Sequence, residues 1–250
     1  MKTITIILTI FFSQYCFAQS SIDDGRYINI YSGITSLSSN VSGSGFSSEL
    51  PGKSGPMLGA DVSYQFKDSS ARVNFFYEHG SNSVNSPSGL TPSQITMSKN
   101  QYTLMVSFVP VDSGMFQNLR LGLGYSVLMQ GGDDTSPNNI STMQSSQGLL
   151  LHASYEIKAG DSFIIQPGLG IYLPYQISEK SQVSGNNPKF MGTELKLTVD
   201  YLISDSFSIF AGVEYNRYQA NFDGTGSRGT SSAQDVRTDL ALPLGFKLGY

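Results

Sequence analysis

The sequence is poor in cysteine and in charge. Cys16 is its single cysteine, and charged residues make up 14% of the 250-residue chain, whereas soluble domains carry about 25%. Because Cys16 falls in a leader that we expect to be removed, the mature chain can build no disulfide framework. Lipid attachment to Cys16 is the alternative. The bulky Tyr15 disfavours it, because lipidation needs a small residue just before the cysteine.

Long apolar runs and cofactor motifs are also missing. After the first segment no stretch approaches 18 apolar residues, which excludes a helical membrane span. The sequence has two histidines, no metal-ligand cluster and no glycine-rich phosphate motif, so we expect no cofactor and no metal. Removing one lysine with the leader shifts the formal net charge from -4 to -5, and this acidity argues against a nucleic-acid partner.

The first residues match a secretory signal peptide. A basic start at Lys2 precedes an apolar stretch from Ile4 to Phe12. Cys16 and Ala18 then supply small residues at the two positions that matter for cleavage. The apolar stretch is too short to span a bilayer as a helix. We therefore expect cleavage after Ala18, which makes residues 1–18 the signal peptide and residues 19–250 one domain.

The strongest signal in the remaining chain is alternation with a period of two. Side chains of a strand point to opposite faces in turn, so a wall that faces lipid is apolar at every second residue. A helix would place Leu240, Leu244 and Lys247 on one face and would therefore not separate apolar from polar residues. The apolar face of the last segment carries Val236, Thr238, Leu240, Leu242, Leu244, Phe246, Leu248 and Tyr250.

The alternation recurs along the chain, and the connections alternate between short and long. This is typical of a barrel with both termini in the periplasm. We predict an all-β, closed antiparallel transmembrane barrel of about ten strands, with short periplasmic turns and long extracellular loops; eight strands is the alternative count. The strand segments are 27–35, 58–66, 71–78, 102–108, 119–129, 149–158, 165–173, 191–201, 209–215 and 236–250. The long connections lie near 36–55, 80–98, 131–146, 177–188 and 220–234, and the short ones near 67–70, 111–117, 159–162 and 203–206.

Outward aromatic residues fall at two levels under this assignment, as the girdles of a membrane barrel do. Pro167 and Pro243 lie inside strands, where proline removes a ladder hydrogen bond, so we expect a bulge or bend at each. The lower level holds Tyr64, Phe66, Phe108, Tyr155, Phe163, Tyr201, Phe207, Phe246 and Tyr250, and the upper level holds Tyr77, Tyr102, Tyr175 and Tyr215.

The ending from Leu240 to Tyr250 resembles the C-terminal signature of bacterial outer-membrane β-barrels. The resemblance implies that the barrel-assembly machinery reads Phe246, Leu248 and Tyr250 as an assembly signal. It also implies a place in the bacterial outer membrane, with outer-membrane lipid and lipopolysaccharide as partners.

Ten-stranded members of that class include omptin proteases and an Opc-like class of adhesin. Omptins use a pair of aspartates and an aspartate–histidine couple near the extracellular rim. His79, Asp133 and Asp134 do not reproduce that spacing. The resemblance therefore does not extend to omptin proteolysis.

The predicted interior carries nearly as many acids as bases. Burying an ion in a narrow lumen costs several kcal/mol unless it is paired, so this balance predicts a salt-bridged plug. A small-solute diffusion channel is the alternative. The predicted network is Asp61, Arg72, Arg120, Glu156, Lys158, Glu194, Lys196, Glu214, Arg237, Asp239 and Lys247. Arg72, Arg120, Lys158 and Lys247 are placed toward the periplasm, and Asp61, Glu156, Glu194, Glu214 and Asp239 higher.

His152, Ser154 and Glu156 share one inward face and form a second candidate cluster. A histidine, a hydroxyl and a carboxylate are the ingredients of acyl-transfer chemistry. The His-x-Ser spacing is similar to that of outer-membrane lipid A 3-O-deacylases. Those enzymes must meet lipid, whereas this trio faces the lumen, so a satisfied polar network is the favoured interpretation and a hydrolase the second alternative.

The long connections are rich in Ser, Gly, Asn and Thr, as in Ser36 to Ser48 and Thr225 to Gln234. Solvated loops of this kind suit surface display. We therefore expect a non-enzymatic membrane protein whose extracellular loops contact a ligand, as in adhesion.

Overall fold

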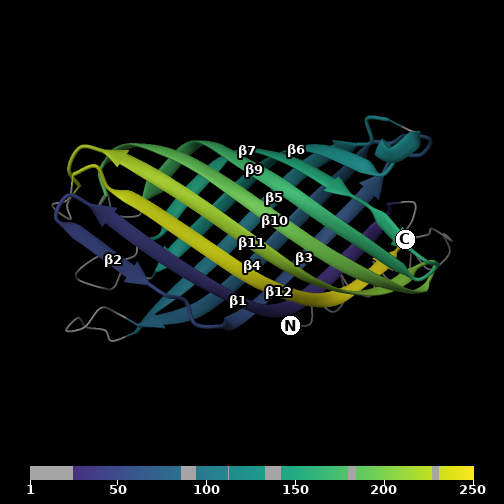
Figure 1. Cartoon of the computed structure of the whole chain (residues 1–250), viewed down its shortest axis with the longest axis horizontal. Coiled ribbons are helices and arrows are strands. Elements are labelled where there is room, and N and C mark those ends of the chain that lie inside the picture. Colours follow the sequence, from purple (N-terminus) through teal and green to yellow (C-terminus); the bar gives the residue numbers. More distant parts are fainter. Residues whose placement is uncertain (1–24, 86–93, 112, 133–141, 180–183, 227–230) are drawn as a thin grey trace, which may run out of the picture.

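The strands close into one antiparallel barrel (Figure 1). The computed structural model describes residues 25–85, 94–111, 113–132, 142–179, 184–226 and 231–250, so the predicted signal peptide lies outside the described residues. Neighbouring strands pair in sequence, and β12 pairs with β1 to close a ring of ten, the predicted number. The ring consists of β1 (Tyr27–Gly43), β3 (Gly55–Gln65), β4 (Arg72–Asn85), β5 (Gln94–Phe108), β6 (Leu119–Gly132), β7 (Gln144–Tyr155), β9 (Phe163–Glu179), β10 (Asn186–Ser204), β11 (Phe207–Asp223) and β12 (Gln234–Gly249).

Two short strands supplement the ring. β2 (Phe46–Leu50) pairs with the far end of β1, and β8 (Ile157–Ala159) continues the line of β7 along β9. A 3-10 turn, η2 (Gly114–Phe116), lies in the connection before β6. Among the described residues, no helix has the length and apolarity needed to cross a membrane.

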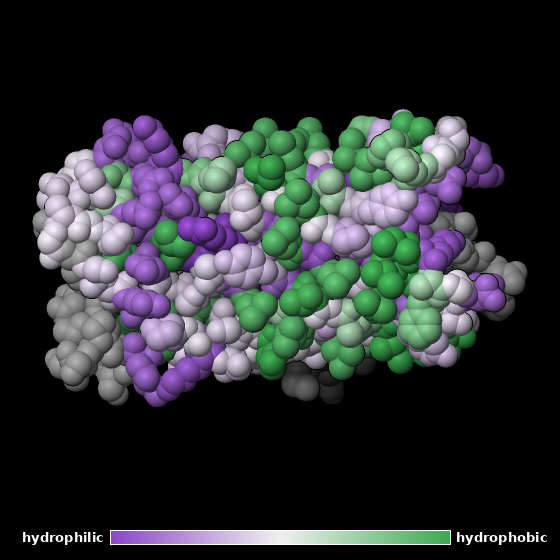
Figure 2. Space-filling view, in the orientation of Figure 1, coloured by the Kyte–Doolittle hydropathy of each residue, from purple (hydrophilic) through white to green (hydrophobic). Residues whose placement is uncertain are grey.

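The outer wall of the barrel is apolar, as the alternation predicts. Leu104 is 54% exposed and Leu244 is 59% exposed, and similar residues on every ring strand form an apolar band. On the face seen in Figure 2, hydrophobic residues gather over the middle and the right of the barrel. Soluble monomers rarely expose contiguous apolar surface on this scale, so the wall is suited to hydrocarbon. Each ring strand contributes at least one exposed large apolar side chain: Ile30, Leu58, Phe75, Leu104, Leu123, Leu149, Leu169, Leu195, Ile209 and Leu244.

Aromatic pairs border this band on both sides. The rings of Tyr77 and Tyr102 lie 5.0 Å apart toward the long-loop end. At the end that carries the short turns, the rings of Phe163 and Tyr201 lie 5.1 Å apart. The first and last strands meet at this same end, where Tyr27 pairs with Gly249. The arrangement matches the two predicted girdles and sets the short-turn end as periplasmic.

Strands occupy much of the chain that we predicted as long loops. β1 continues to Gly43 inside the predicted loop 36–55, and β5 begins at Gln94 inside the predicted loop 80–98. Beyond the apolar band the outward residues are polar, so the alternation of hydropathy stops although the backbone ladder continues. The hydroxyls of Ser38 and Thr238 hydrogen-bond across β1 and β12 in this part of the wall.

Of the bulge or bend expected at Pro167 and Pro243, the bulge is wrong at both positions. β10 pairs with β9 in constant register through Leu197 and Pro167, and β1 pairs with β12 in constant register through Gly33 and Pro243. On the other side of each proline the ladder skips two residues in both strands and resumes in the same register. The missing N–H is therefore accommodated by a local gap in the ladder. A register shift occurs instead where Gly148 of β7 meets Pro174 of β9.

Gly59 on β3 leaves room for the ring of Tyr31, which crosses it inside the barrel. A Cβ at position 59 would lie 2.2 Å from Cζ of Tyr31. We expect Gly59→Ala to lower the free energy of unfolding by about 1–3 kcal/mol, the cost typical of overpacking. Urea titration of the barrel in lipid vesicles measures this loss.

Gly168→Ala is the matched control. The nearest atom to a Cβ at that position is Nε2 of His152, 3.2 Å away at the end of a side chain that can rotate. Gly168→Ala should lower the free energy of unfolding less than Gly59→Ala does. An equal loss in the two variants would contradict the packing of Tyr31 against Gly59.

Candidate functional site

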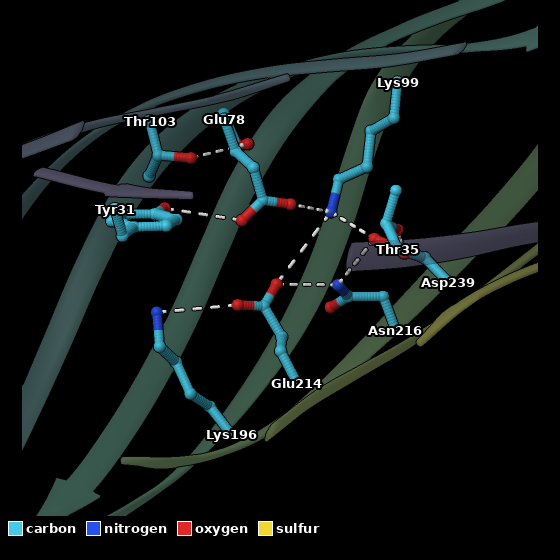
Figure 3. Close-up of polar contacts among 10 residues, drawn as sticks. Tyr31, Thr35, Glu78, Lys99, Thr103, Lys196, Glu214, Asn216 and Asp239 are labelled. Carbon is cyan, nitrogen blue, oxygen red and sulfur yellow. Dashed lines mark hydrogen bonds and ion pairs between the residues drawn. The ribbon is translucent and has the colours of Figure 1, made fainter. Parts of the chain in front are cut away.

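Lys99 on β5 is fully buried, and its ammonium contacts carboxylates from three other strands (Figure 3). Its Nζ lies 2.7 Å from Oε1 of Glu78 on β4 and 2.6 Å from Oδ2 of Asp239 on β12. Oε1 of Glu214 on β11 lies 3.9 Å away. We call these four residues the Lys99 cluster. Because β12 stands four strands from β5 around the ring, the cluster spans the lumen instead of lining one wall.

Further polar groups hold the carboxylates of the Lys99 cluster in place. Oγ1 of Thr35 donates to Oδ1 of Asp239 at 2.5 Å, and Nδ2 of Asn216 donates to Oε1 of Glu214 at 2.7 Å. Nζ of Lys196 lies 3.5 Å from Oε2 of Glu214. Pairing and hydrogen bonding of this kind are what buried charges need in order to be stable.

Arg237 on β12 makes a second connection across the lumen. Its Nη2 lies 2.8 Å from Oδ2 of Asp235 and donates to the carbonyl oxygen of Thr142 at 2.8 Å. Its Nη1 donates to the carbonyl oxygen of Gln130 at the end of β6. β6 and β12 are five strands apart in a ring of ten, so they face each other. Nε2 of Gln144 also donates to Oδ2 of Asp235 at 2.9 Å. The arginine therefore ties opposite walls together.

Apolar side chains pack inside the extracellular part of the barrel. One cluster combines residues of β1, β2, β4 and β5, and another combines residues of β6, β7, β9 and β11. Together with the Arg237 contacts they occupy the lumen on the extracellular side of the Lys99 cluster. The first cluster is Leu37, Leu50, Val84, Ile95 and Met97, and the second is Leu128, Leu150, Tyr172 and Tyr218.

Below the Lys99 cluster the lumen widens into a cavity of about 140 Å³. Its wall includes Asp61 of β3, Arg72 of β4 and Arg120 of β6. Glu194 and Lys196 of β10 line its other side. The lining of the cavity therefore carries charges of both signs.

The two arginines lie at the periplasmic end of this cavity. Nη2 of Arg72 and Nη2 of Arg120 both donate to Oε1 of Gln65, at 3.2 and 3.4 Å. Nη1 of Arg120 also donates to the carbonyl oxygen of Ser70, in the periplasmic turn between β3 and β4, at 2.9 Å. These contacts place both guanidinium groups between the cavity and the periplasm.

No protein-family model matches the sequence, and no curated protein matches it. Among solved structures, the outer membrane protease OmpT from Escherichia coli is similar with a TM-score of 0.60 and 11% identity, over 94% of this chain and 99% of OmpT. The outer membrane protein OprG from Pseudomonas aeruginosa is similar with a TM-score of 0.40 and 15% identity, over 90% and 96% of the two chains.

The fold is that of bacterial outer-membrane β-barrels. Together with the apolar outer wall, it places this chain in the bacterial outer membrane. At 11% identity the likeness concerns the fold alone.

The predicted network residues of the barrel separate into several groups. Glu214 and Asp239 belong to the Lys99 cluster, and Lys196 contacts Glu214. Arg237 pairs with Asp235, and Lys247 lies 2.9 Å from Asp200. Asp61, Arg72, Arg120 and Glu194 line the cavity.

The predicted high position of Glu156 in the lumen is wrong. Its backbone N–H donates to the carbonyl oxygen of Asn118, in the periplasmic connection before β6, at 3.1 Å. β7 ends one residue earlier, at Tyr155, so Glu156 lies at the periplasmic end of the strand. Lys158 is exposed on β8 at the same end. His152 and Ser154 line the cavity, and Glu156 is outside its lining, so the structure does not bring the trio together.

Lys99 and Asp235 were not among the lumen residues predicted from the sequence. Both lie just beyond the predicted strand ends, at positions 102 and 236, in residues that continue β5 and β12. Extending the alternation along both strands would have identified them, because the odd-numbered residues of both strands point inward. Asp133 and Asp134 lie outside the described residues.

The end of the chain closes the barrel. The hydroxyl of Tyr250 donates to the carbonyl oxygen of Ser63 at 2.9 Å, and its backbone N–H donates to that of Arg26 at 3.3 Å. The rings of Phe246 and Phe207 lie 6.4 Å apart in the periplasmic girdle, and Leu248 pairs with Ile28 of β1. The residues of the predicted assembly signal thus lie at the seam between the first and last strands.

Proposed function

We propose that this barrel is a sealed, non-enzymatic protein of the outer membrane whose extracellular surface binds a ligand outside the cell, as in adhesion. The observation that carries the proposal is the set of buried contacts that cross the lumen. A solute crossing the barrel would have to break the buried Lys99 cluster and the contacts of Arg237, which both join opposite walls. Breaking buried ion pairs of this kind costs several kcal/mol.

The extracellular wall supports a role in contact. Beyond the apolar band, side-chain amides and hydroxyls bond to one another across strands, and this end of the surface is hydrophilic (Figure 2). Nε2 of Gln234 donates to Oδ1 of Asn221 at 2.9 Å, and the hydroxyl of Tyr125 donates to Oε1 of Gln147 at 2.9 Å. Neutral donors and acceptors of this type suit sugars and peptide backbones. Outer-membrane lipid, lipopolysaccharide and the assembly machinery are the further partners of the proposal.

Two measurements test the proposal together. Purified barrel in planar bilayers should give no stepwise conductance, because the lumen is closed. Cells of a non-adherent strain that produce the barrel should adhere to surfaces coated with extracellular matrix more than cells carrying the empty vector. A charged replacement of the outward ladder, Gln234→Glu with Asn221→Asp, should reduce adherence while leaving the lumen intact.

Other outcomes would favour the alternatives. Steady conductance of the unmodified barrel would support a small-solute channel, for which the periplasmic cavity would be the wide part of the path. Altered lipid A in producing cells, restored by Ser154→Ala, would support a hydrolase, since Ser154 and His152 line that cavity.

A further inference from the structure

We propose that the cavity in the periplasmic half of the lumen is a binding site for a small zwitterion, a solute that carries both a carboxylate and an ammonium group. The site goes beyond the proposed surface function and does not depend on it. Two observations support it: the cavity is lined by hydrogen-bonding groups that lack partners, and its lining carries charges of both signs.

The acceptor side of the cavity has unused capacity. Oδ1 of Asp61 and Oε1 of Gln101 are buried and have no hydrogen-bond partner. Both residues line the cavity, as does the carboxylate-bearing Glu194. A buried acceptor without a partner costs about 1–3 kcal/mol. An ammonium group in the cavity would donate to these oxygens and remove that cost.

The donor side is equally incomplete. Arg72 and Arg120 share one neutral oxygen, Oε1 of Gln65, and Nε of Arg72 has no partner. Among the described residues neither guanidinium forms an ion pair with a carboxylate. Guanidinium groups bind carboxylates in pairs of parallel, charge-assisted hydrogen bonds. The carboxylate of a ligand would supply the missing partner.

The balance of charges selects the class of ligand. The lining carries three positive charges, on Arg72, Arg120 and Lys196, and two negative charges, on Asp61 and Glu194, a net of +1 with histidine neutral. A simple anion would leave the acceptors unsatisfied, and a simple cation would meet the guanidinium groups. A zwitterion satisfies both sides.

Size and access restrict the ligand further. A cavity of about 140 Å³ holds on the order of ten water molecules at roughly one per 10–15 Å³, which suits a small solute and excludes a lipid. The Lys99 cluster closes the extracellular side, because Lys196 of the lining also contacts Glu214 of that cluster. The ligand therefore enters past Arg120 from the periplasm.

Calorimetric titration of the full barrel in detergent micelles tests the site. The probes are two zwitterions, glycine and 4-aminobutyrate, and two singly charged analogues, acetate and ethylammonium. We expect saturable binding of at least one zwitterion and weaker binding of both analogues. Arg72→Gln and Asp61→Asn should each weaken zwitterion binding about ten- to hundredfold, the effect of losing one hydrogen bond to a charged group.

Matched controls separate the site from general effects of charge. Arg217→Gln and Asp223→Asn remove the same charges from exposed positions of β11 and should leave binding unchanged. Heat-modifiable migration in gels shows that each variant is folded. Absence of saturable binding to both zwitterions would mean that the cavity holds only water and would overturn the proposal. Equal binding of acetate and glycine, unaffected by Asp61→Asn, would overturn it in favour of an anion site. Neither result bears on conductance or adherence.

Discussion

Lys99→Met should lower the free energy of unfolding of the barrel by about 3–5 kcal/mol, the cost of removing one partner from a buried ion pair. The substitution leaves Glu78 and Asp239 without the ammonium that lies 2.7 and 2.6 Å from them. Both carboxylates are almost fully buried, so water cannot replace the lost charge. Urea titration of the folded barrel in lipid vesicles measures the loss.

Lys53→Met is the matched control, because Lys53 is exposed and its ammonium group donates only to Oδ1 of Asn85 in the described contacts. A compensating variant sharpens the test. Adding Glu78→Gln and Asp239→Asn to Lys99→Met removes the unpaired charges and leaves Glu214 beside Lys196, so more than half of the stability should return. If Lys99→Met were as stable as Lys53→Met, the cluster would not hold the barrel together.

Arg237→Met should have an effect of similar size, about 3–5 kcal/mol, for a related reason. The guanidinium satisfies the carboxylate of Asp235 and two backbone carbonyl oxygens, those of Gln130 and Thr142. Its loss removes the charged donor from these acceptors, leaves Asp235 with neutral donors such as Gln144, and removes the contact between β12 and the opposite wall. Hydrogen exchange should therefore accelerate at the extracellular end of β6, and urea titration should show the global loss.

Arg217→Met provides the comparison for this prediction. Arg217 lies on the adjacent strand, opposite Thr238, but its side chain is exposed on the outside of the barrel. This variant should match the unmodified protein in both measurements. Exchange that accelerates only near β12, with β6 unchanged, would show that Arg237 stabilises its own strand and does not tie the walls together.

The sequence correctly predicted which residues point into the lumen, as far as the apolar band extends. Arg72, Glu194 and Asp239 all point inward, as parity requires. Which of them meet was not predictable, because partners such as Lys99 and Asp239 are 140 residues apart in the chain. Their contact depends on the curvature of the closed ring, and no periodic pattern in one strand contains that information.

The errors have a common cause. Lys99 and Asp235 were missed because hydropathy alternation ends where the wall leaves the apolar band, although hydrogen-bonded strands continue to Gly43, Asn85 and Asp223. Pro167 and Pro243 were expected to bulge because each lacks an N–H, yet the neighbouring strand loses its pairing at the same place and the register is preserved.

The amino-acid sequence alone determined the class of fold and which face of each strand meets lipid, because lipid imposes one simple rule on every second residue and that rule is local. It favoured ten strands but left eight as the alternative. Only the tertiary structure decided that side chains meet across the extracellular half of the lumen and that a cavity lies in the periplasmic half. This follows from how side chains of distant strands fill a cylinder: Lys99 and Arg237 reach across it, whereas the arginines at the periplasmic end reach only Gln65 and a turn.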